Sequence, residues 1–325
     1  MSAAHVSDPH SAAPDLEAIR AAHRRIAPRI HRTPVLTSAS LDQLSGARLF
    51  FKCENLQRTG SFKFRGATNA VFSIAENELR NGVAAPSSGN HAAALALAAR
   101  MRGAPCYIVM PRNSSPIKIR AVEFYGGRIT LCEPNVAARE AASCELIERT
   151  RAQLVHPYND ARVIAGQGTA ALEFLEQEPE LDILIAPVSG GGLLSGNAIA
   201  AKGLWPGIRV IGAEPANADD TFRSLRAGEI APAAKTETMA DGLRATLCPL
   251  TFGILRSRVD EISLVSEEEI VAAMRLVWER MKLVIEPSAA VAVAPALQRR
   301  IGAQGKHVGI ILSGGNLDLG NLPFH

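Results

Sequence analysis

Residues 183–201 read Ile-Leu-Ile-Ala-Pro-Val-Ser-Gly-Gly-Gly-Leu-Leu-Ser-Gly-Asn-Ala-Ile-Ala-Ala. The apolar run Ile183–Val188 predicts a buried strand, and Leu194–Ala201 predicts a helix. Between them, Ser189-Gly190-Gly191-Gly192-Leu193 predicts a tight turn that opens the helix. A strand, a turn and a helix in this order are the building unit of parallel α/β folds. The bare backbone N–H groups of such a turn also suit a phosphate, and a tight turn without a ligand is the alternative.

The same alternation of short apolar runs and longer helical runs continues along the chain. The other expected strands are Arg48–Lys52, Tyr107–Met110, Arg128–Leu131, Arg209–Ala213 and Val308–Leu312. The other expected helices are His91–Arg102, Val136–Arg151, Gly168–Glu176 and Ile270–Lys282. Ser266 and Glu269 form a capping box in front of the last of these. We therefore expect an α/β protein with parallel sheets flanked by helices on both faces.

The chain shows no internal repeat and no long linker that would separate independent domains. We expect a small module at residues 72–151, inserted into a large domain that residues 1–71 and 152–325 form. In a protein of this kind, a ligand is expected in the cleft between the domains, at the carboxyl ends of the strands.

Composition excludes several classes of function. The 325 residues carry 35 basic and 32 acidic side chains without a basic patch, and only 5% are aromatic, so nucleic-acid binding is not expected. The five cysteines form no C-x-x-C pair, which speaks against a disulfide framework or a structural zinc site. No apolar run has the length of a membrane span, and Met1–Pro14 lacks the pattern of a signal peptide. A cytoplasmic protein is therefore expected.

The segment Thr59-Gly60-Ser61-Phe62-Lys63-Phe64-Arg65-Gly66 is the first that carries chemistry. A lysine amine is normally protonated and unreactive, but in a dry pocket it can form a Schiff base with an aldehyde cofactor. Gly60 and Ser61 predict a turn and a helix start, which would hold Lys63 on a defined element. The alternative is a solvated lysine in a loop.

Two further segments with serine and glycine lie at the ends of predicted elements, one at the start of a helix and one at the end of a strand. Ser87-Ser88-Gly89-Asn90-His91 opens a long alanine-rich helix, where hydroxyl and free N–H groups suit a carboxylate. Simple capping of the helix is the alternative. The last predicted strand ends in the segment Leu312-Ser313-Gly314-Gly315-Asn316, which would place the Ser313 hydroxyl at the expected cleft. An ordinary turn is the alternative.

In this order, the four segments resemble the serine/threonine dehydratase and serine racemase family of fold-type II pyridoxal-phosphate enzymes. The resemblance runs from about Ile30 to Leu319. It implies a two-domain fold similar to the tryptophan synthase β subunit, with the active site in the interdomain cleft. The stretches that support it are Lys52-Cys53-Glu54-Asn55-Leu56-Gln57, Val163-Ile164-Ala165-Gly166-Gln167-Gly168-Thr169, Ala240-Asp241-Gly242 and Ile285-Glu286-Pro287.

The resemblance implies pyridoxal 5'-phosphate as the cofactor, with Lys63 joined to it as a Schiff base. Phe62 would lie against the pyridine ring, Asn90 would bond the ring 3-hydroxyl, and Ser313 would meet the ring nitrogen. The remaining cofactor-binding positions would be Ser189, Gly190, Gly191, Gly192 and Leu193 for the phosphate, together with Glu286. The implied substrate-binding positions are Ser87, Ser88, Asn90, His91 and Arg139.

The segment Glu214-Pro215-Ala216-Asn217-Ala218-Asp219-Asp220 is similar to the divalent-cation site of the racemase-like branch. The resemblance implies that the carboxylates of Glu214 and Asp220 and the carbonyl of Ala218 coordinate Mg²⁺ or Ca²⁺. Oxygen ligands suit such hard cations. A solvated acidic helix start is the alternative.

The implied activity is that of an ammonia-lyase (dehydratase), which eliminates water from a 3-hydroxy amino acid and gives a 2-oxo acid and ammonia. Serine, threonine, threo-3-hydroxyaspartate and 3-phenylserine fit this chemistry. Arg139 lies where some relatives hold a second carboxylate, and a solvated arginine is equally compatible. An amino-acid racemase with Ser88 as a second acid/base, or a non-catalytic binding protein, are the alternatives. A homodimer that acts on a small-molecule amino acid is expected.

Overall fold

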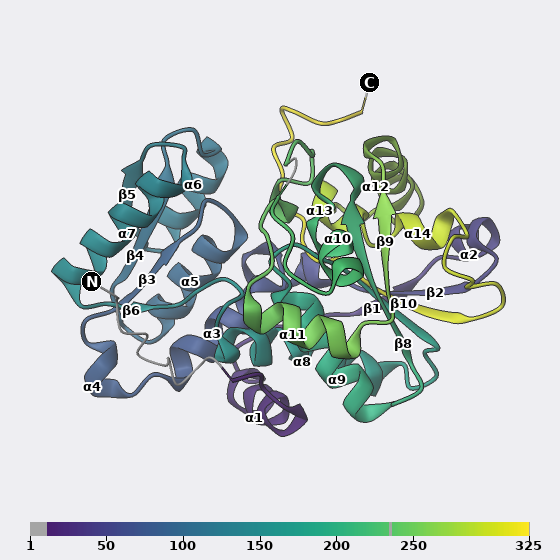
Figure 1. Ribbon diagram of the computed structural model, residues 1–325, viewed down its shortest axis with the longest axis horizontal. Helices are drawn as coiled ribbons and strands as arrows, with labels where there is room; N and C mark the ends of the chain where they lie inside the picture. Colours follow the sequence, from purple (N-terminus) through teal and green to yellow (C-terminus); the bar gives the residue numbers. More distant parts are fainter. Residues whose placement is uncertain (1–11, 234–235, 325) are drawn as a thin grey trace.

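The computed structural model describes residues 12–233 and 236–324. Within them, the strands form one six-stranded and one four-stranded sheet, which lie side by side in Figure 1 with helices on both faces of each. This confirms the expected α/β fold with parallel sheets. Every helix in the described residues is too short or too polar to span a lipid bilayer.

The larger sheet has the strand order β1-β2-β10-β7-β8-β9. Only β1 is antiparallel to its neighbour, and the other pairs are parallel. Its strands are β1 (Val35–Thr37), β2 (Arg48–Lys52), β7 (Ile183–Pro187), β8 (Arg209–Pro215), β9 (Glu261–Val265) and β10 (His307–Ile311).

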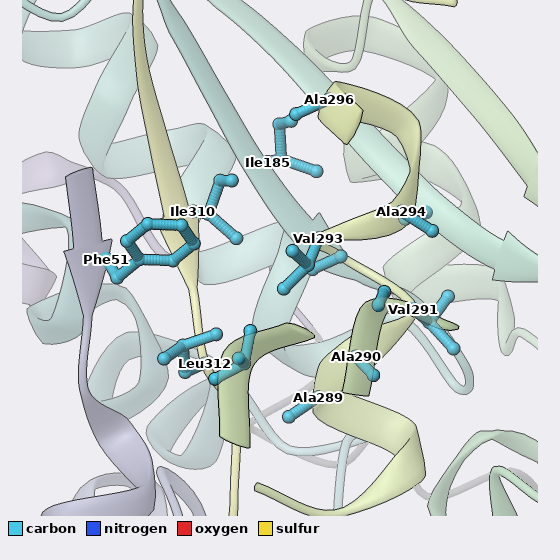
Figure 2. Close-up of a cluster of buried hydrophobic side chains, with 14 of the residues drawn as sticks. Phe51, Ile185, Ala289, Ala290, Val291, Val293, Ala294, Ala296, Ile310 and Leu312 are labelled. Atoms are coloured by element: carbon cyan, nitrogen blue, oxygen red, sulfur yellow. The ribbon is translucent and has the colours of Figure 1, made fainter. Parts of the chain in front are cut away.

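Both faces of the larger sheet are buried under helices, and successive side chains of a strand point to opposite faces. Phe51 and Ile310 belong to one apolar cluster, and Figure 2 shows them directed toward Val293. Phe50 and Leu184 belong to the cluster on the other face. The helices on the first face are α2 (Ala39–Ser45), α12 (Glu267–Met281), α13 (Pro287–Ala290) and α14 (Ala294–Leu297). Those on the second are α1 (Leu16–Ile26), α8 (Ala161–Gln177), α9 (Gly192–Leu204) and α11 (Pro249–Arg258).

The smaller sheet is parallel throughout and has the order β5-β4-β3-β6. Its strands are β3 (Val83–Pro86), β4 (Cys106–Pro111), β5 (Arg128–Cys132) and β6 (Gln153–Leu154). The helices around it are α3 (Lys63–Ser73), α4 (Glu76–Leu79), α5 (Asn90–Met101), α6 (Pro116–Phe124) and α7 (Val136–Thr150). The expected module edge at residue 151 falls just before β6. Since β6 pairs with β3, we propose that the small module extends through Leu154.

The six strands expected from the sequence are present, with edges that differ by at most two residues. The capping box of Ser266 and Glu269 is confirmed at the start of α12. The expected helix start at Gly168 was wrong, because α8 begins seven residues earlier, at Ala161. Asp160 caps it there by accepting a hydrogen bond from the Arg162 N–H. Helix α12 ends at Met281, since Lys282 has the left-handed backbone of a cap.

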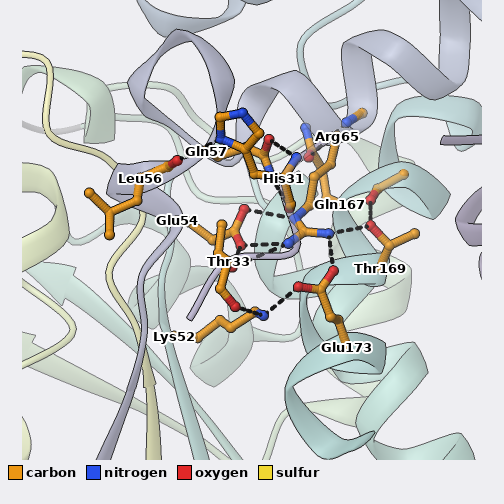
Figure 3. A network of polar contacts seen from close by, with 12 residues as sticks. His31, Thr33, Lys52, Glu54, Leu56, Gln57, Arg65, Gln167, Thr169 and Glu173 are labelled. Carbon is orange, nitrogen blue, oxygen red and sulfur yellow. Dashed lines mark hydrogen bonds and ion pairs between the residues drawn. The ribbon is translucent and has the colours of Figure 1, made fainter. Parts of the chain in front are cut away.

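A buried ion network joins the start of α3 to the larger sheet and to α8 (Figure 3). The Arg65 guanidinium donates two hydrogen bonds of 2.7 Å to Glu54 and one of 3.0 Å to Glu173. The Lys52 ammonium donates to the other oxygen of Glu173 at 2.6 Å and to the Thr33 carbonyl at 2.8 Å. Two positive and two negative charges therefore balance one another away from water.

Helices α3 and α8 also touch along their backbones. A Cβ atom on Gly166 would lie 2.6 Å from the Cα atom of Gly66, so neither helix can carry a side chain at this point. The close approach and the ion network fix α3 against the large domain, and α3 begins at Lys63.

Replacing Glu173 with glutamine should destabilise the protein strongly, since it leaves two buried cations with one carboxylate. We expect a loss of about 3–5 kcal/mol in the free energy of unfolding. The matched control is Glu133→Gln in the exposed pair with Arg112, which should cost below about 1 kcal/mol. Urea unfolding of both variants measures the difference, and equal midpoints would contradict the role of the network.

Candidate active site

A cavity of about 200 Å³ opens between the two sheets. Its wall includes the residues that follow β3, β7 and β10, at the carboxyl ends of these strands, where open parallel sheets bind ligands. The expected cofactor and substrate positions that line it are Phe62, Lys63, Ser87, Ser88, Asn90, His91, Ser189, Gly190, Gly191, Gly192, Leu193, Glu286 and Ser313. The structure therefore brings together four segments that lie far apart in the sequence.

Lys63 is the first residue of α3 and projects into this cavity. Its Nζ atom donates a hydrogen bond of 3.3 Å to the Pro157 carbonyl and lies 5.0 Å from the centre of the Phe62 ring. Burial lowers the pKa of the Lys63 amine to about 8, and the charge of Glu286 opposes that shift. About a tenth of the amine is therefore neutral at pH 7, far more than for a lysine with an ordinary pKa, and a nucleophilic lysine needs this neutral form.

The backbone around Lys63 is tied to the segment that follows β10. The Phe62 N–H donates to the Ser313 carbonyl at 3.0 Å, and Ser61 forms a β-bridge with Gly314. Ser313 is buried at the cavity wall. The lysine and the serine therefore have a fixed relative position.

The glycine turn packs closely against Tyr158. A Cβ atom on Gly190 would lie 2.5 Å from the Tyr158 ring, and Gly191 has the left-handed φ of +88° that favours glycine. Helix α9 begins at Gly192, so N–H groups without a helical partner face this turn. The Ser189 hydroxyl is engaged with the backbone of Ala245, at 3.0 Å from its N–H and 3.2 Å from its carbonyl. The turn fits a phosphate held by backbone amides.

Asn90 connects the small module to the large domain. Its Nδ2 donates to Glu286 at 2.8 Å, and its Oδ1 accepts from Asn316 at 2.9 Å. One hydrogen of the Nδ2 group is left for a ligand. Burial raises the pKa of Glu286 to about 8, and the charge of Asp241 adds to this rise. Asn316 was not predicted as a site residue, although it lies in the segment Leu312-Ser313-Gly314-Gly315-Asn316.

The turn before α5 holds the expected carboxylate-binding residues. The Ser87 hydroxyl accepts a hydrogen bond of 3.4 Å from the Gly89 N–H. His91 is buried, and its Nε2 atom lies 2.9 Å from the Val155 carbonyl. Burial, together with the charge of Lys63, lowers the pKa of His91 to about 3. His91 is therefore neutral, and it secures the start of α5 rather than adding a positive charge.

Four other residues of this region carry chemistry, and none of them was predicted as a site residue, although Asp241 lies in a stretch that supports the family resemblance. His156 and Tyr158 make an edge-to-face ring contact with centroids 4.6 Å apart. Burial, and then the charge of Lys63, lowers the pKa of His156 to about 4. Lys118 and Asp241 form an ion pair at the cavity wall. They are 123 residues apart in the chain, so no local pattern could indicate that they pair.

Arg139 lies on α7, and the cavity wall does not include it. Arg139 is nevertheless close enough to His156 and Tyr158 for its positive charge to act on both, and in each case this charge works to lower the pKa. For Tyr158, burial and the charge of Cys248 outweigh Arg139, and the pKa is raised. The role of Arg139 in binding substrate stays a prediction.

The expected metal ligands lie at the end of β8 and the start of α10 (Asp220–Ala227), with Ala218 in the short helix between them. Both Glu214 carboxylate oxygens accept backbone hydrogen bonds of 2.9 Å, from Thr221 and Phe222. Burial raises the pKa of Glu214 to about 8 and that of Asp220 to about 6. Within the described residues, the buried Oδ2 of Asp220 has no hydrogen-bond partner. A bound cation would compensate these two buried carboxyl groups, so the residues fit one.

No group of three or more histidine, cysteine, aspartate or glutamate side chains among residues 12–233 and 236–324 has the arrangement of a metal site. A cation at Glu214 and Asp220 would therefore need the Ala218 carbonyl and water as further ligands. All five cysteines of the chain are free.

Comparison with known proteins agrees with this geometry. The family described as "Pyridoxal-phosphate dependent enzyme" matches residues 26–314. The chain is 50% identical to a serine racemase of Dictyostelium discoideum, over 94% of this chain and 96% of that one. It is 49% identical to a beta-hydroxyaspartate dehydratase of Paracoccus denitrificans, over 96% and 99%. The structure of maize serine racemase superposes with a TM-score of 0.93 at 48% identity, covering 95% of both chains. The protein belongs to the family of pyridoxal-phosphate dependent enzymes.

Proposed function

We propose that this protein is an ammonia-lyase that removes water from a 3-hydroxy amino acid and releases a 2-oxo acid and ammonia. The observation that carries the proposal is the hydrogen bond of the Phe62 N–H to the Ser313 carbonyl, which holds Lys63 and the neutral Ser313 hydroxyl in the wall of one cavity. The dehydratase of Paracoccus denitrificans, similar over nearly its whole length, supports the same reaction class. Serine, threonine, threo-3-hydroxyaspartate and 3-phenylserine are the candidate substrates.

The cofactor position follows from the groups that the cavity offers. The amides of Gly190 to Leu193 would hold the phosphate, Phe62 would lie against the ring, and the free N–H of Asn90 would meet the ring hydroxyl. When bound, pyridoxal phosphate withdraws electrons from the Cα atom of the substrate and acidifies its proton.

Lys63 then acts as the general base. Its amine is poised for this because burial brings its pKa to about 8, close to the working pH at which a base is most effective. Ser313 contributes by its neutrality. A carboxylate in its place would stabilise a protonated ring nitrogen and a long-lived carbanion, whereas a neutral hydroxyl favours prompt loss of the 3-hydroxyl group.

Covalent uptake of pyridoxal phosphate by the cofactor-free protein should follow the protonation of Lys63. Because only the neutral amine attacks, we expect the rate to rise about tenfold per pH unit below pH 8 and to level off above about pH 8. Absorbance during mixing, followed by borohydride reduction and mass measurement, records the linkage. Lys63→Ala should give no reducible linkage, and a rate that keeps rising to pH 10 would contradict the lowered pKa.

The proposed activity is tested by the release of 2-oxo acid and ammonia in equal amounts. Each of the four candidate substrates is supplied in every configuration at Cα and Cβ. At least one should be converted, and Lys63→Ala should lose nearly all of that turnover. If none of the four gives a 2-oxo acid, the protein is not this type of ammonia-lyase.

Amino-acid racemisation is the second candidate function, supported by the serine racemases at 50% and 48% identity and by Ser88 in the cavity wall. Inversion at Cα needs an acid/base on the face opposite Lys63. In the same assay, Ser88→Ala should keep elimination from the L-substrate and lose racemisation and D-substrate turnover. A proportional loss for both isomers would show that Ser88 only binds the substrate carboxylate.

We also propose that Glu214, Ala218 and Asp220 bind Mg²⁺ or Ca²⁺. The support is the buried Asp220 oxygen that lacks a partner in the described part of the chain, next to a second buried carboxyl group. An oxygen-only set of this kind suits a hard cation.

Removing that cation should lower the melting temperature, because a ligand that binds only the native state stabilises it. At a hundred times its Kd the contribution is about 2.7 kcal/mol. Excess chelator should therefore destabilise the wild type, and added Mg²⁺ or Ca²⁺ should restore it. Asp220→Asn should no longer respond to chelator, whereas the control Asp219→Asn should. A wild-type melting curve that chelator leaves unchanged would remove the metal.

A reducing compartment is proposed because all five cysteines are free, three of them buried. The expected homodimer stays a prediction of the family resemblance.

A further inference from the structure

Lys118 and Asp241 bridge the two parts of the molecule at the cavity. Lys118 lies on α6 of the small module, and Asp241 lies on the short helix η4 (Asp241–Leu243) of the large domain. The two side chains form an ion pair and both contribute to the cavity wall. The Lys118 side chain is 19% exposed and that of Asp241 is 47% exposed, so water reaches the pair.

The Lys118 ammonium lies above the turn that precedes α5. Its Nζ atom is 3.9 Å from the point that a Cβ atom on Gly89 would occupy. Gly89 follows Ser87 and Ser88, the residues expected to bind the substrate carboxylate. A positive charge therefore lies next to the place where that carboxylate is expected.

The rest of the wall offers little competing positive charge. Among the described residues that line the cavity, the basic side chains are Lys63, Lys118 and His91. Lys63 is committed to the cofactor in the proposed function, and His91 is neutral because burial lowers its pKa to about 3. Of these three basic side chains, Lys118 is thus the one whose positive charge can bind an anionic ligand.

Asp241 is a partner of Lys118 that another carboxylate can replace. A partly exposed ion pair is weak, because water and salt screen it and the long lysine side chain must be held in place. A carboxylate that arrives with the substrate presents the same chemistry as Asp241. It can replace Asp241 as the partner of Lys118 at little net cost.

We propose that Lys118 is a specificity-determining residue that binds a carboxylate of the amino-acid substrate, and that Asp241 occupies it as an internal competitor until the substrate arrives. The inference rests on the proposed function for the nature of the substrate. It assigns to Lys118 and Asp241 opposite effects on affinity, which a purely structural bridge would not have.

The experiment measures carboxylate binding to the holoenzyme by calorimetry, with the unreactive ligands propanoate and succinate. Lys118→Met should weaken binding by about tenfold, the smaller end of what a hydrogen bond to a charged group contributes. Asp241→Asn should strengthen it, because the competitor is gone. The double variant should bind like Lys118→Met, and Lys118→Arg should recover part of the affinity.

The matched control is Arg120→Met, which removes an exposed positive charge from the same helix and should leave binding unchanged. Equal losses for propanoate and succinate would place Lys118 at the α-carboxylate. If Lys118→Met leaves the affinity for propanoate unchanged and lowers only the affinity for succinate, Lys118 binds a second carboxylate. If Asp241→Asn weakens binding as Lys118→Met does, or if neither changes it, the proposal is wrong and the pair only joins the two modules.

Binding of these ligands requires no turnover, so the result is separate from the proposed reaction. Absence of 2-oxo acid from every substrate, with Lys118-dependent carboxylate binding intact, would overturn the ammonia-lyase function alone. Turnover with carboxylate binding that ignores Lys118 would overturn this inference alone.

Discussion

The neutralisation of Arg65 is the interaction on which the site depends. Its guanidinium has no contact with water, and its charge is balanced by Glu54 and Glu173, with Lys52 sharing the second carboxylate. Removing any one of these charges would leave an unpaired ion in a medium that solvates it poorly. Arg65 lies two residues after Lys63 on the same helix. The contacts that hold Arg65 therefore also fix the position of Lys63, the proposed catalytic residue.

The shape of the cavity depends on this anchored helix and on two further contacts, which are called ties below. One is the backbone pairing of the Lys63 segment with the residues after β10, and the other is the contact of Asn90 with Glu286. The first tie lies within the large domain, whereas the second crosses from α5 to the large domain. Apolar packing reinforces this crossing, because Phe64 and Ala67 of α3 belong to the same buried cluster as Ala92 and Leu95 of α5.

The sequence predicted the parts of the fold that local patterns encode. The strands β2, β7, β8 and β10 are apolar runs, and α12 carries its own capping box, so each was recognisable by itself. Strand β3 was missed because Val-Ala-Ala-Pro lacks a β-branched pattern, and β6 because it has two residues. The Arg65 network was also not predicted, since Glu54, Arg65 and Glu173 are brought together only by the packing of α3 on α8. The residues of the cofactor cavity were found by resemblance, and the contact of Lys118 with Asp241 was not, because nothing local links residues so distant in the chain.

The electrostatics of the cavity favour backbone groups as the ligands of the proposed anions. Burial keeps His91 and His156 neutral and lowers the pKa of Lys63, so the wall holds less positive charge than its basic residues suggest. An anion must then be held by oriented N–H dipoles, which remain at full strength when buried because they carry no net charge that burial could neutralise. In the proposed function, the glycine turn would supply such dipoles for a phosphate, and the start of α5 would supply them for a carboxylate. An ammonium at the edge of the cavity, rather than a cation beside Lys63, would let a carboxylate bind without lowering the pKa of Lys63 further.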